Sequence, residues 1–205
     1  MASHFFFKDE EQKGSVPANS TPTSSCNTEN PTKNIESVYF DDRQNTLWQN
    51  KVYVQALSFA KEHRLFNILD FGCGSAYKLV LYSCPPDFEF VGQDIEPTLS
   101  WLKEKYPMYT WQQSFSMPPL EIHLILCVDV LQYFYEPERV LKFFQDKYPN
   151  TYLVLSAPLK KDRIRPPNAM EWNYFEFKSM VTAYFCLLKH EIYLDHLPGE
   201  WVIWA

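Results

Sequence analysis

The stretch of sequence that decides the fold is Ile68-Leu69-Asp70-Phe71-Gly72-Cys73-Gly74-Ser75-Ala76. It completes a short apolar run that starts at Leu65 and stops at a pair of glycines. Such a run predicts a buried strand followed by a tight turn. Glycine has no Cβ, so the backbone of the turn can approach a bound ligand closely. The stretch therefore predicts a strand, then a loop suited to ligand binding, then a helix over residues 77–82.

Helical and strand patterns alternate along the rest of the chain. Apolar residues at helical spacing predict further helices over residues 46–63, 97–105, 137–147 and 171–185. Short apolar or aromatic runs predict strands over residues 65–71, 88–93, 108–112, 122–128 and 151–156. A turn at residues 197–199 predicts a closing antiparallel hairpin of residues 187–195 and 200–204. The order predicts an α/β fold with a doubly wound, mostly parallel, seven-stranded sheet that ends in this hairpin.

The N-terminal residues differ in composition from the rest of the chain. Residues 15–33 are rich in Ser, Thr, Pro and Asn and contain almost no large apolar side chains. Such a segment cannot offset its own ordering entropy. We therefore expect residues 1–35 to be a disordered or low-complexity tail, or a leader that docks late. Residues 36–205 are expected to form one domain, because their length suffices for a full hydrophobic core.

Charge and cysteine content narrow the class of protein. The net charge of −6 argues against a nucleic-acid partner, since nucleic-acid binders usually carry a basic excess. The five cysteines include no Cys-x-x-Cys pair, which argues against a disulfide framework and against a zinc site. Reduced thiols indicate a cytoplasmic protein. No apolar run reaches the roughly 18 residues that a membrane span needs, so no membrane span and no metal are expected.

Two acids at strand ends indicate the kind of ligand. Asp70 lies two residues before the first glycine of the loop, at the strand end, where a carboxylate would repel a dinucleotide phosphate. A cationic ligand with an amino group would suit this position instead. Asp94 ends the second predicted strand, at an offset from Gly72 where an acid can accept hydrogen bonds from both hydroxyls of a ribose.

The pattern Asp-x-Gly-x-Gly after the first strand, with an acid after the second, resembles the class I S-adenosylmethionine-dependent methyltransferases over about residues 40–205. The resemblance implies a Rossmann-like methyltransferase fold with S-adenosyl-L-methionine as cofactor. It implies that the glycine loop lies under the methionine part of the cofactor and that Asp94 holds the ribose. Residues 127–131 match the family loop that lines the cofactor and the substrate. The cofactor-binding residues expected on this basis are Asp70, Gly72, Cys73, Gly74, Asp94, Ile95, Gln113 and Asp129.

A narrower resemblance concerns the acceptor. Residues 48–53, 166–168 and 171–172 resemble a bacterial subgroup whose members often accompany sugar-transferring and cell-surface polysaccharide enzymes. This resemblance implies a small-molecule or saccharide-type acceptor. Arg163 and Arg165 lie in a basic run after the fifth strand. Guanidinium groups pair well with phosphate or carboxylate, so this run is a candidate binding site for an anionic acceptor. A solvated loop is the alternative for this run. The candidate substrate-binding residues are Arg163, Arg165 and Trp172.

Several residues depart from the family pattern. Ala76 stands where the family commonly has a third glycine, and Gln132-Tyr133 stands where many relatives carry Glu-His. Tyr133 is a weak catalytic candidate, because its phenol could orient a nucleophile; a core aromatic is the alternative. The sequence thus predicts a methyltransferase acting on a small molecule or saccharide. A catalytically weak or inactive binding or scaffold protein is the alternative, with a nicotinamide-dependent oxidoreductase and a protein methyltransferase as further rivals.

Overall fold

The computed structural model describes residues 49–82, 88–158, 170–193 and 200–204. Within these ranges one sheet of seven strands has the order β3-β2-β1-β4-β5-β7-β6. The first five strands in this order are parallel, and β7 pairs antiparallel with both β5 and β6. The strands are β1 (Asn67–Phe71), β2 (Glu89–Asp94), β3 (Thr110–Gln113), β4 (Leu124–Val128), β5 (Tyr152–Pro158), β6 (Lys189–Tyr193) and β7 (Glu200–Trp204). The prediction of a mostly parallel α/β sheet is confirmed.

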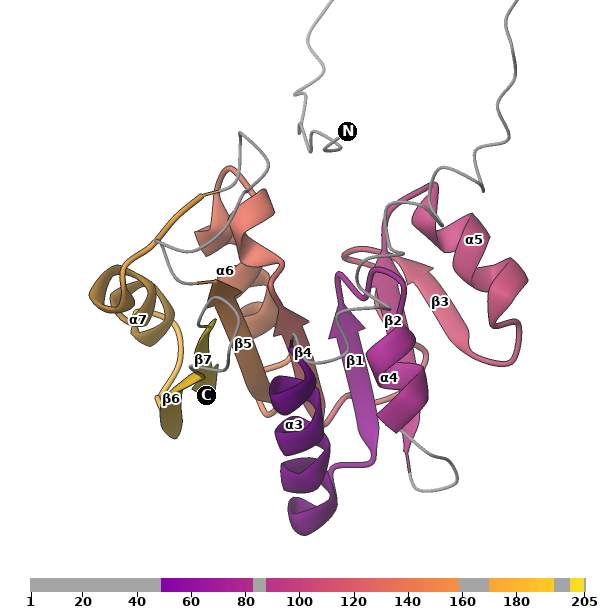
Figure 1. The fold of residues 1–205 in the computed structure, drawn as a ribbon, viewed down its shortest axis with the longest axis horizontal. Helices are drawn as coiled ribbons and strands as arrows, with labels where there is room; N and C mark the ends of the chain where they lie inside the picture. Colours follow the sequence, from indigo (N-terminus) through magenta and orange to yellow (C-terminus); the bar gives the residue numbers. More distant parts are fainter. Residues whose placement is uncertain (1–48, 83–87, 159–169, 194–199, 205) are drawn as a thin grey trace, which may run out of the picture.

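Helices cover both faces of the sheet (Figure 1). Successive side chains of a strand point to opposite faces, and β1 shows this division. Ile68 belongs to the core that also holds residues of α3 (Asn50–His63), α4 (Tyr77–Tyr82) and α5 (Thr98–Lys105), and the first two of these helices lie in front of the strands in Figure 1. The neighbouring Leu69 and Phe71 belong to the core on the other face, which includes α6 (Pro137–Lys147) and α7 (Tyr174–Thr182). The sheet is therefore doubly wound.

The order of the strands reverses between β1 and β4. From β1 the chain moves outward through β2 to β3, and it then returns to place β4 on the other side of β1. The carboxyl ends of β1 and β4 both point to the upper edge of the sheet in Figure 1. In parallel α/β sheets ligands bind outside the carboxyl ends of the strands at such a switch point. The topology thus directs attention to the loops that follow β1, β2 and β4.

The first helix and the first strand begin later than the sequence predicts. Residues 46–48 lie outside the described residues, and α3 begins at Asn50. The strand begins at Asn67 because the chain before it completes the end of α3. Arg64 has a left-handed conformation (φ 58°), and the N–H of Leu65 donates to the carbonyl of Ala60 over 2.8 Å. This closing turn is a common helix end, so the apolar character of residue 65 serves the cap and not the strand.

The last helix is shorter than predicted, and its own capping residues explain why. Oδ1 of Asn173 accepts hydrogen bonds from the N–H groups of Phe175 and Glu176, and the Glu176 carboxylate accepts from the N–H of Asn173. This reciprocal capping box starts α7 at Tyr174 and not at residue 171. The helix ends at Thr182. A short 3-10 helix, η1 (Leu131–Tyr133), also follows β4 and was not predicted.

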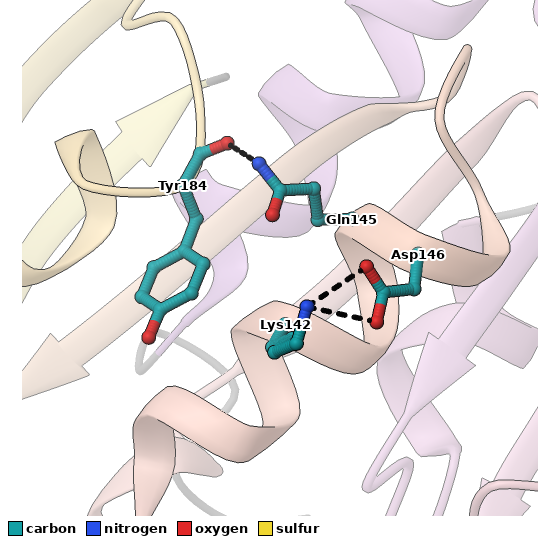
Figure 2. Close-up of polar contacts among 4 residues, drawn as sticks. All are labelled: Lys142, Gln145, Asp146 and Tyr184. Carbon is teal, nitrogen blue, oxygen red and sulfur yellow. Dashed lines mark hydrogen bonds and ion pairs between the residues drawn. The ribbon is translucent and has the colours of Figure 1, made fainter.

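Two polar contacts mark the outer side of α6 (Figure 2). The side-chain amide of Gln145 donates to the backbone carbonyl of Tyr184 over 2.6 Å, which ties α6 to the turn after α7. Lys142 and Asp146 form an exposed ion pair one helical turn apart, at 3.1 Å. Exposed pairs of this kind contribute little to stability. These two residues therefore serve below as matched controls for charge changes elsewhere.

The described residues contain neither a membrane-spanning helix nor a cluster suited to a metal ion. None of the helices in these ranges combines the length and the apolar character that crossing a membrane requires. In the same part of the chain, His, Cys, Asp and Glu side chains do not gather in groups of three or more that could hold a metal ion.

Candidate functional site

Left-handed backbone conformations gather in the loops at the carboxyl edge of the sheet. The loop after β1 contains Gly72 (φ 75°), Gly74 (φ 53°) and Ala76 (φ 51°). Phe115 (φ 67°) follows β3, and Asp129 (φ 56°) follows β4. For a residue with a side chain this conformation costs roughly 1–2 kcal/mol. Strain of this kind persists where surrounding contacts impose it, and it is often found at ligand sites.

Gly72 fits a space that no larger residue could occupy. Its N–H donates to the carbonyl of Gln93 over 2.7 Å, and the N–H of Cys73 donates to the same oxygen over 3.1 Å. A Cβ at Gly72 would lie 2.5 Å from Cγ2 of Val130, in the loop after β4. The glycine loop is thus held between the end of β2 and the loop after β4, at the switch point.

Asp94 binds the glycine loop directly. Its Oδ2 accepts a hydrogen bond from the N–H of Gly74 over 2.8 Å, and its Oδ1 accepts from the N–H of Ile95 over 2.8 Å. Burial raises the pKa of Asp94, whereas these two backbone N–H groups lower it. Each carboxylate oxygen can accept more than one hydrogen bond. The acid is therefore able to bind two further donors, such as a pair of neighbouring hydroxyls.

Asp70 is a second acid at the same loop, and it is almost completely buried, with 1% of its surface exposed. The hydroxyl of Tyr53, on α3, donates to Oδ2 of Asp70 over 3.2 Å. Burial raises the pKa of Asp70 from 3.8 to about 7; the charge of Asp94 adds to this increase, and Lys78 opposes it. A buried carboxyl group with a raised pKa is stabilised in its charged form by a nearby cation. The electrostatics of the loop thus favour a cationic ligand.

Asp129 is held in its strained conformation by contacts from β5 and η1. Its N–H donates to the hydroxyl oxygen of Ser156 over 3.1 Å, and that hydroxyl donates to Oδ1 of Asp129 over 3.1 Å. The amide of Gln132 donates to the carbonyl of Asp129 over 2.7 Å. Gln132 is 4% exposed, and within the described part of the chain its Oε1 has no hydrogen-bond partner.

Gln49 and Lys78 belong to the same site and were missed by sequence reasoning. The amide of Gln49 donates to Oδ2 of Asp129 over 3.0 Å, and its Oε1 accepts from Nζ of Lys78 over 3.2 Å. Lys78 is 4% exposed. One signal in the sequence could have identified it, because Lys78 is the one charged residue of the helix Tyr77–Tyr82, directly after the glycine loop. Charged residues are rarely buried unless they are paired.

Of the remaining predicted site residues, Gln113 is the register partner of Asp94 on the neighbouring strand, and Arg163 and Arg165 cannot be placed. Gln113 is exposed at the end of β3, and Tyr133 is 44% exposed on η1. Trp172 packs against Phe177, with 5.5 Å between the ring centroids. Arg163 and Arg165 lie outside the described residues.

Cys73 is buried within the glycine loop. Burial raises the pKa of its thiol well above the ordinary value, and the charges of Asp94 and Asp70 add to this increase. A reactive cysteine needs a thiolate. Cys73 therefore contributes its backbone and its packing to the loop, and no nucleophile.

Comparisons with known proteins show the fold. No family model matches the chain, and no curated protein does. Human N-acetylserotonin methyltransferase, solved in complex with S-adenosylmethionine, matches with a TM-score of 0.63 at 12% identity, over 84% of this chain and 56% of that chain. A SAM-dependent methyltransferase from Aquifex aeolicus matches with a TM-score of 0.57 at 15% identity, over 84% of this chain and 97% of that chain.

A third solved structure is the cyclase SpnF, with a TM-score of 0.54 at 14% identity, over 71% of this chain and 61% of that chain. This chain thus spans less than two thirds of the length of the cyclase and of the human enzyme. At these identities the comparisons establish a methyltransferase-like α/β fold. The same fold serves a cyclase, and a fold by itself does not determine a reaction.

Proposed function

We propose that this protein is an S-adenosylmethionine-dependent methyltransferase that acts on a small-molecule or saccharide-type acceptor. One observation carries the proposal: the glycine loop after β1 lies between two acids, the buried Asp70 and the partly buried Asp94, and Asp94 binds the loop backbone at Gly74. These two carboxylates would repel a phosphate group, so the loop is not suited to a phosphate ligand. A sulfonium ligand with a ribose matches both acids, one through its charge and the other through its hydroxyls.

The described residues fit this cofactor by the chemistry of their groups. The backbone of residues 72–74 would lie under the methionine part, and Asp94 would accept hydrogen bonds from the ribose hydroxyls. Ile95 follows β2 and Gln113 ends β3, and both would border the adenine. The cofactor supplies the methyl group together with its leaving group. The protein has to align the acceptor with the methyl group and exclude water.

The acceptor would bind on the β4–β5 side of the site. Tyr133 and Trp172 are the described residues that we assign to it, and the N–H of Met170 donates to the carbonyl of Gln132, which places the segment before α7 beside η1. Arg163 and Arg165 would pair with an anionic group of the acceptor. A cytoplasmic location is part of this proposal, since Cys73 and Cys127 are free and buried.

Calorimetric titration with S-adenosylmethionine tests the cofactor assignment. The unaltered protein should bind the cofactor, and Asp94→Ala should weaken binding by about tenfold to a hundredfold, because hydrogen bonds to a charged group are lost. Asp94→Asn keeps an oxygen for the N–H of Gly74, so its affinity for the cofactor should lie between those of the unaltered protein and Asp94→Ala. Asp146→Asn, on the exposed side of α6, should bind as the unaltered protein does. A folded protein that binds no cofactor, or an Asp94→Ala variant that binds it normally, would refute the proposal.

A second candidate is a protein that binds the cofactor without transferring its methyl group. Gln132 favours this candidate, because a buried amide cannot accept a proton as a general base. The two candidates differ in turnover. Release of S-adenosylhomocysteine in the presence of phenols, sugars or sugar phosphates would support the enzyme. Tight binding with no release across these acceptor classes would support the binding protein.

A further inference from the structure

Two buried side chains of opposite charge are joined at the switch point by a neutral amide. Lys78 lies on α4, directly after the glycine loop of β1, and Asp129 follows β4, the neighbouring strand. Gln49 lies between them, accepting from the ammonium of Lys78 over 3.2 Å and donating to the carboxylate of Asp129 over 3.0 Å. Both charged residues are less than a tenth exposed. The three groups thus bridge the strands between which ligands bind in this class of sheet.

The amide of Gln49 presents the same pattern as an amino-acid zwitterion. Its oxygen faces an ammonium, and its nitrogen faces a carboxylate. An α-amino acid offers a carboxylate and an ammonium in corresponding positions, but with full charges. Two opposite charges in contact gain a Coulomb attraction that a charge–amide hydrogen bond lacks, and this attraction is stronger in a buried site than in water. Replacing the amide with a zwitterion would therefore strengthen both contacts.

The backbone conformation of Gln49 favours release of its side chain from Lys78 and Asp129. It precedes α3 in a left-handed conformation, with φ at 59°, and its side chain makes no capping hydrogen bond to the helix. Such a conformation costs roughly 1–2 kcal/mol in a residue with a side chain. The contacts of its amide with Lys78 and Asp129 help to offset that cost, so a ligand that takes over these contacts would allow the first turn to relax.

We propose that Lys78 and Asp129 form a zwitterion subsite, in which the carboxylate of an amino-acid ligand binds Lys78 and its ammonium binds Asp129, in place of the Gln49 amide. The proposal rests on the proposed function, because it assigns this subsite to the methionine end of the cofactor. Lys78 and Asp129 then decide between ligands that carry an amino-acid group and nucleosides that lack one. No bond is made or broken in this exchange.

The test compares two nucleosides by calorimetry. S-adenosylhomocysteine carries the zwitterion, whereas 5′-methylthioadenosine has the same adenine, ribose and sulfur without it. Lys78→Met should weaken binding of S-adenosylhomocysteine about tenfold or more and change that of methylthioadenosine less than about threefold. The exposed Lys142→Met, which also removes one positive charge, should change neither affinity (Figure 2).

Two further variants separate exchange from simple structural support. Asp129→Asn should weaken the binding of S-adenosylhomocysteine more than that of methylthioadenosine, as Lys78→Met should. Gln49→Ala should bind S-adenosylhomocysteine at least as tightly as the unaltered protein, because the competing amide is gone. A loss in Gln49→Ala as large as that in Lys78→Met would overturn the exchange. Should Lys78→Met fail to fold in thermal unfolding, the Asp129→Asn comparison decides.

The outcomes distinguish this proposal from the cofactor assignment. If the unaltered protein binds neither nucleoside, the proposed function fails, and the subsite fails with it. If it binds both and Lys78→Met weakens both equally or neither, the cofactor assignment stands and the zwitterion subsite is refuted. If Lys78→Met and Asp129→Asn selectively lose affinity for S-adenosylhomocysteine, both the cofactor assignment and the zwitterion subsite are supported.

Discussion

At the scale of single residues, Asp70 links the stability of the fold to pH. Its pKa rises from 3.8 to about 7 on folding, chiefly through burial. The folded protein thus holds this proton more tightly than the unfolded chain does. Protonated Asp70 contributes stability below about pH 4, and this contribution is lost as the pH rises through 7. Near neutral pH a cation beside Asp70 would restore part of it.

Asp70→Asn should therefore remove one component of the pH dependence of stability. Between pH 4 and pH 8 the free energy of unfolding of the unaltered protein should fall, relative to that of Asp70→Asn, by on the order of 2–4 kcal/mol. Urea unfolding of both proteins at several pH values measures this difference. The exposed Asp146→Asn serves as control and should show no such trend. An Asp70→Asn variant whose stability runs parallel to that of the unaltered protein would contradict the raised pKa.

Gly72 shows how a single Cβ decides whether the loop can form. Gly72→Ala would combine a left-handed conformation, at φ 75°, with a clash of 2.5 Å against Val130. We expect a loss of about 2 kcal/mol or more in the free energy of unfolding, measured in urea. Val130→Ala removes the clashing methyl groups, so the double variant should lose less than the sum of the two single variants. Simple additivity would show that the clash plays no part.

At the scale of elements, α7 depends on two residues for its first turn. Asn173 accepts hydrogen bonds from two backbone N–H groups, and Glu176 accepts one in return. Val181 and Phe177 of this helix are fully buried in the core on the α6 face. The start of α7 thus sets how the segment with Trp172 meets the sheet.

Asn173→Ala should shorten α7 from its N-terminus. We expect a loss of about 0.5–2 kcal/mol in the free energy of unfolding, because two N–H groups lose their acceptor. Asn173→Asp keeps an acceptor oxygen and should retain most of the stability, and it is the matched control. Thermal or urea unfolding measures both variants. Equal stability of Asn173→Ala and Asn173→Asp would show that the cap contributes nothing.

At the scale of the whole molecule, the site exists because the strand order reverses. β1 and β4 are adjacent in the sheet but far apart in the chain, and the loops after them meet where Gly72 packs against Val130. The N-terminal end of α3 closes over the same place through Gln49 and Tyr53. Three separate segments thus supply one cluster of buried polar groups, with α6 and α7 supporting the sheet from its other face (Figure 1).

The alternation of helices and strands, the glycine loop and its two acids could all be predicted from the sequence. Each of them is a local pattern. Helical and strand periodicity reflect which side chains face the core, and a glycine pair after an apolar run reflects backbone geometry. Asp70 and Asp94 were predicted because each lies in the last two residues of its strand, so their position in the chain already places them at the edge of the sheet.

Only the tertiary structure showed that Gln49 and Ser156 belong to the site. The contact of Gln49 with Asp129 joins residues 80 positions apart, and that of Ser156 with Asp129 joins residues 27 apart. No periodicity in the chain specifies such contacts, because they depend on how far each strand and helix extends and on which elements become neighbours. The sequence by itself determined the elements and the chemistry of the glycine loop. The packing of β1, β4 and α3 decided which polar side chains complete the site, because a buried charge is stable only where folding brings a partner to it.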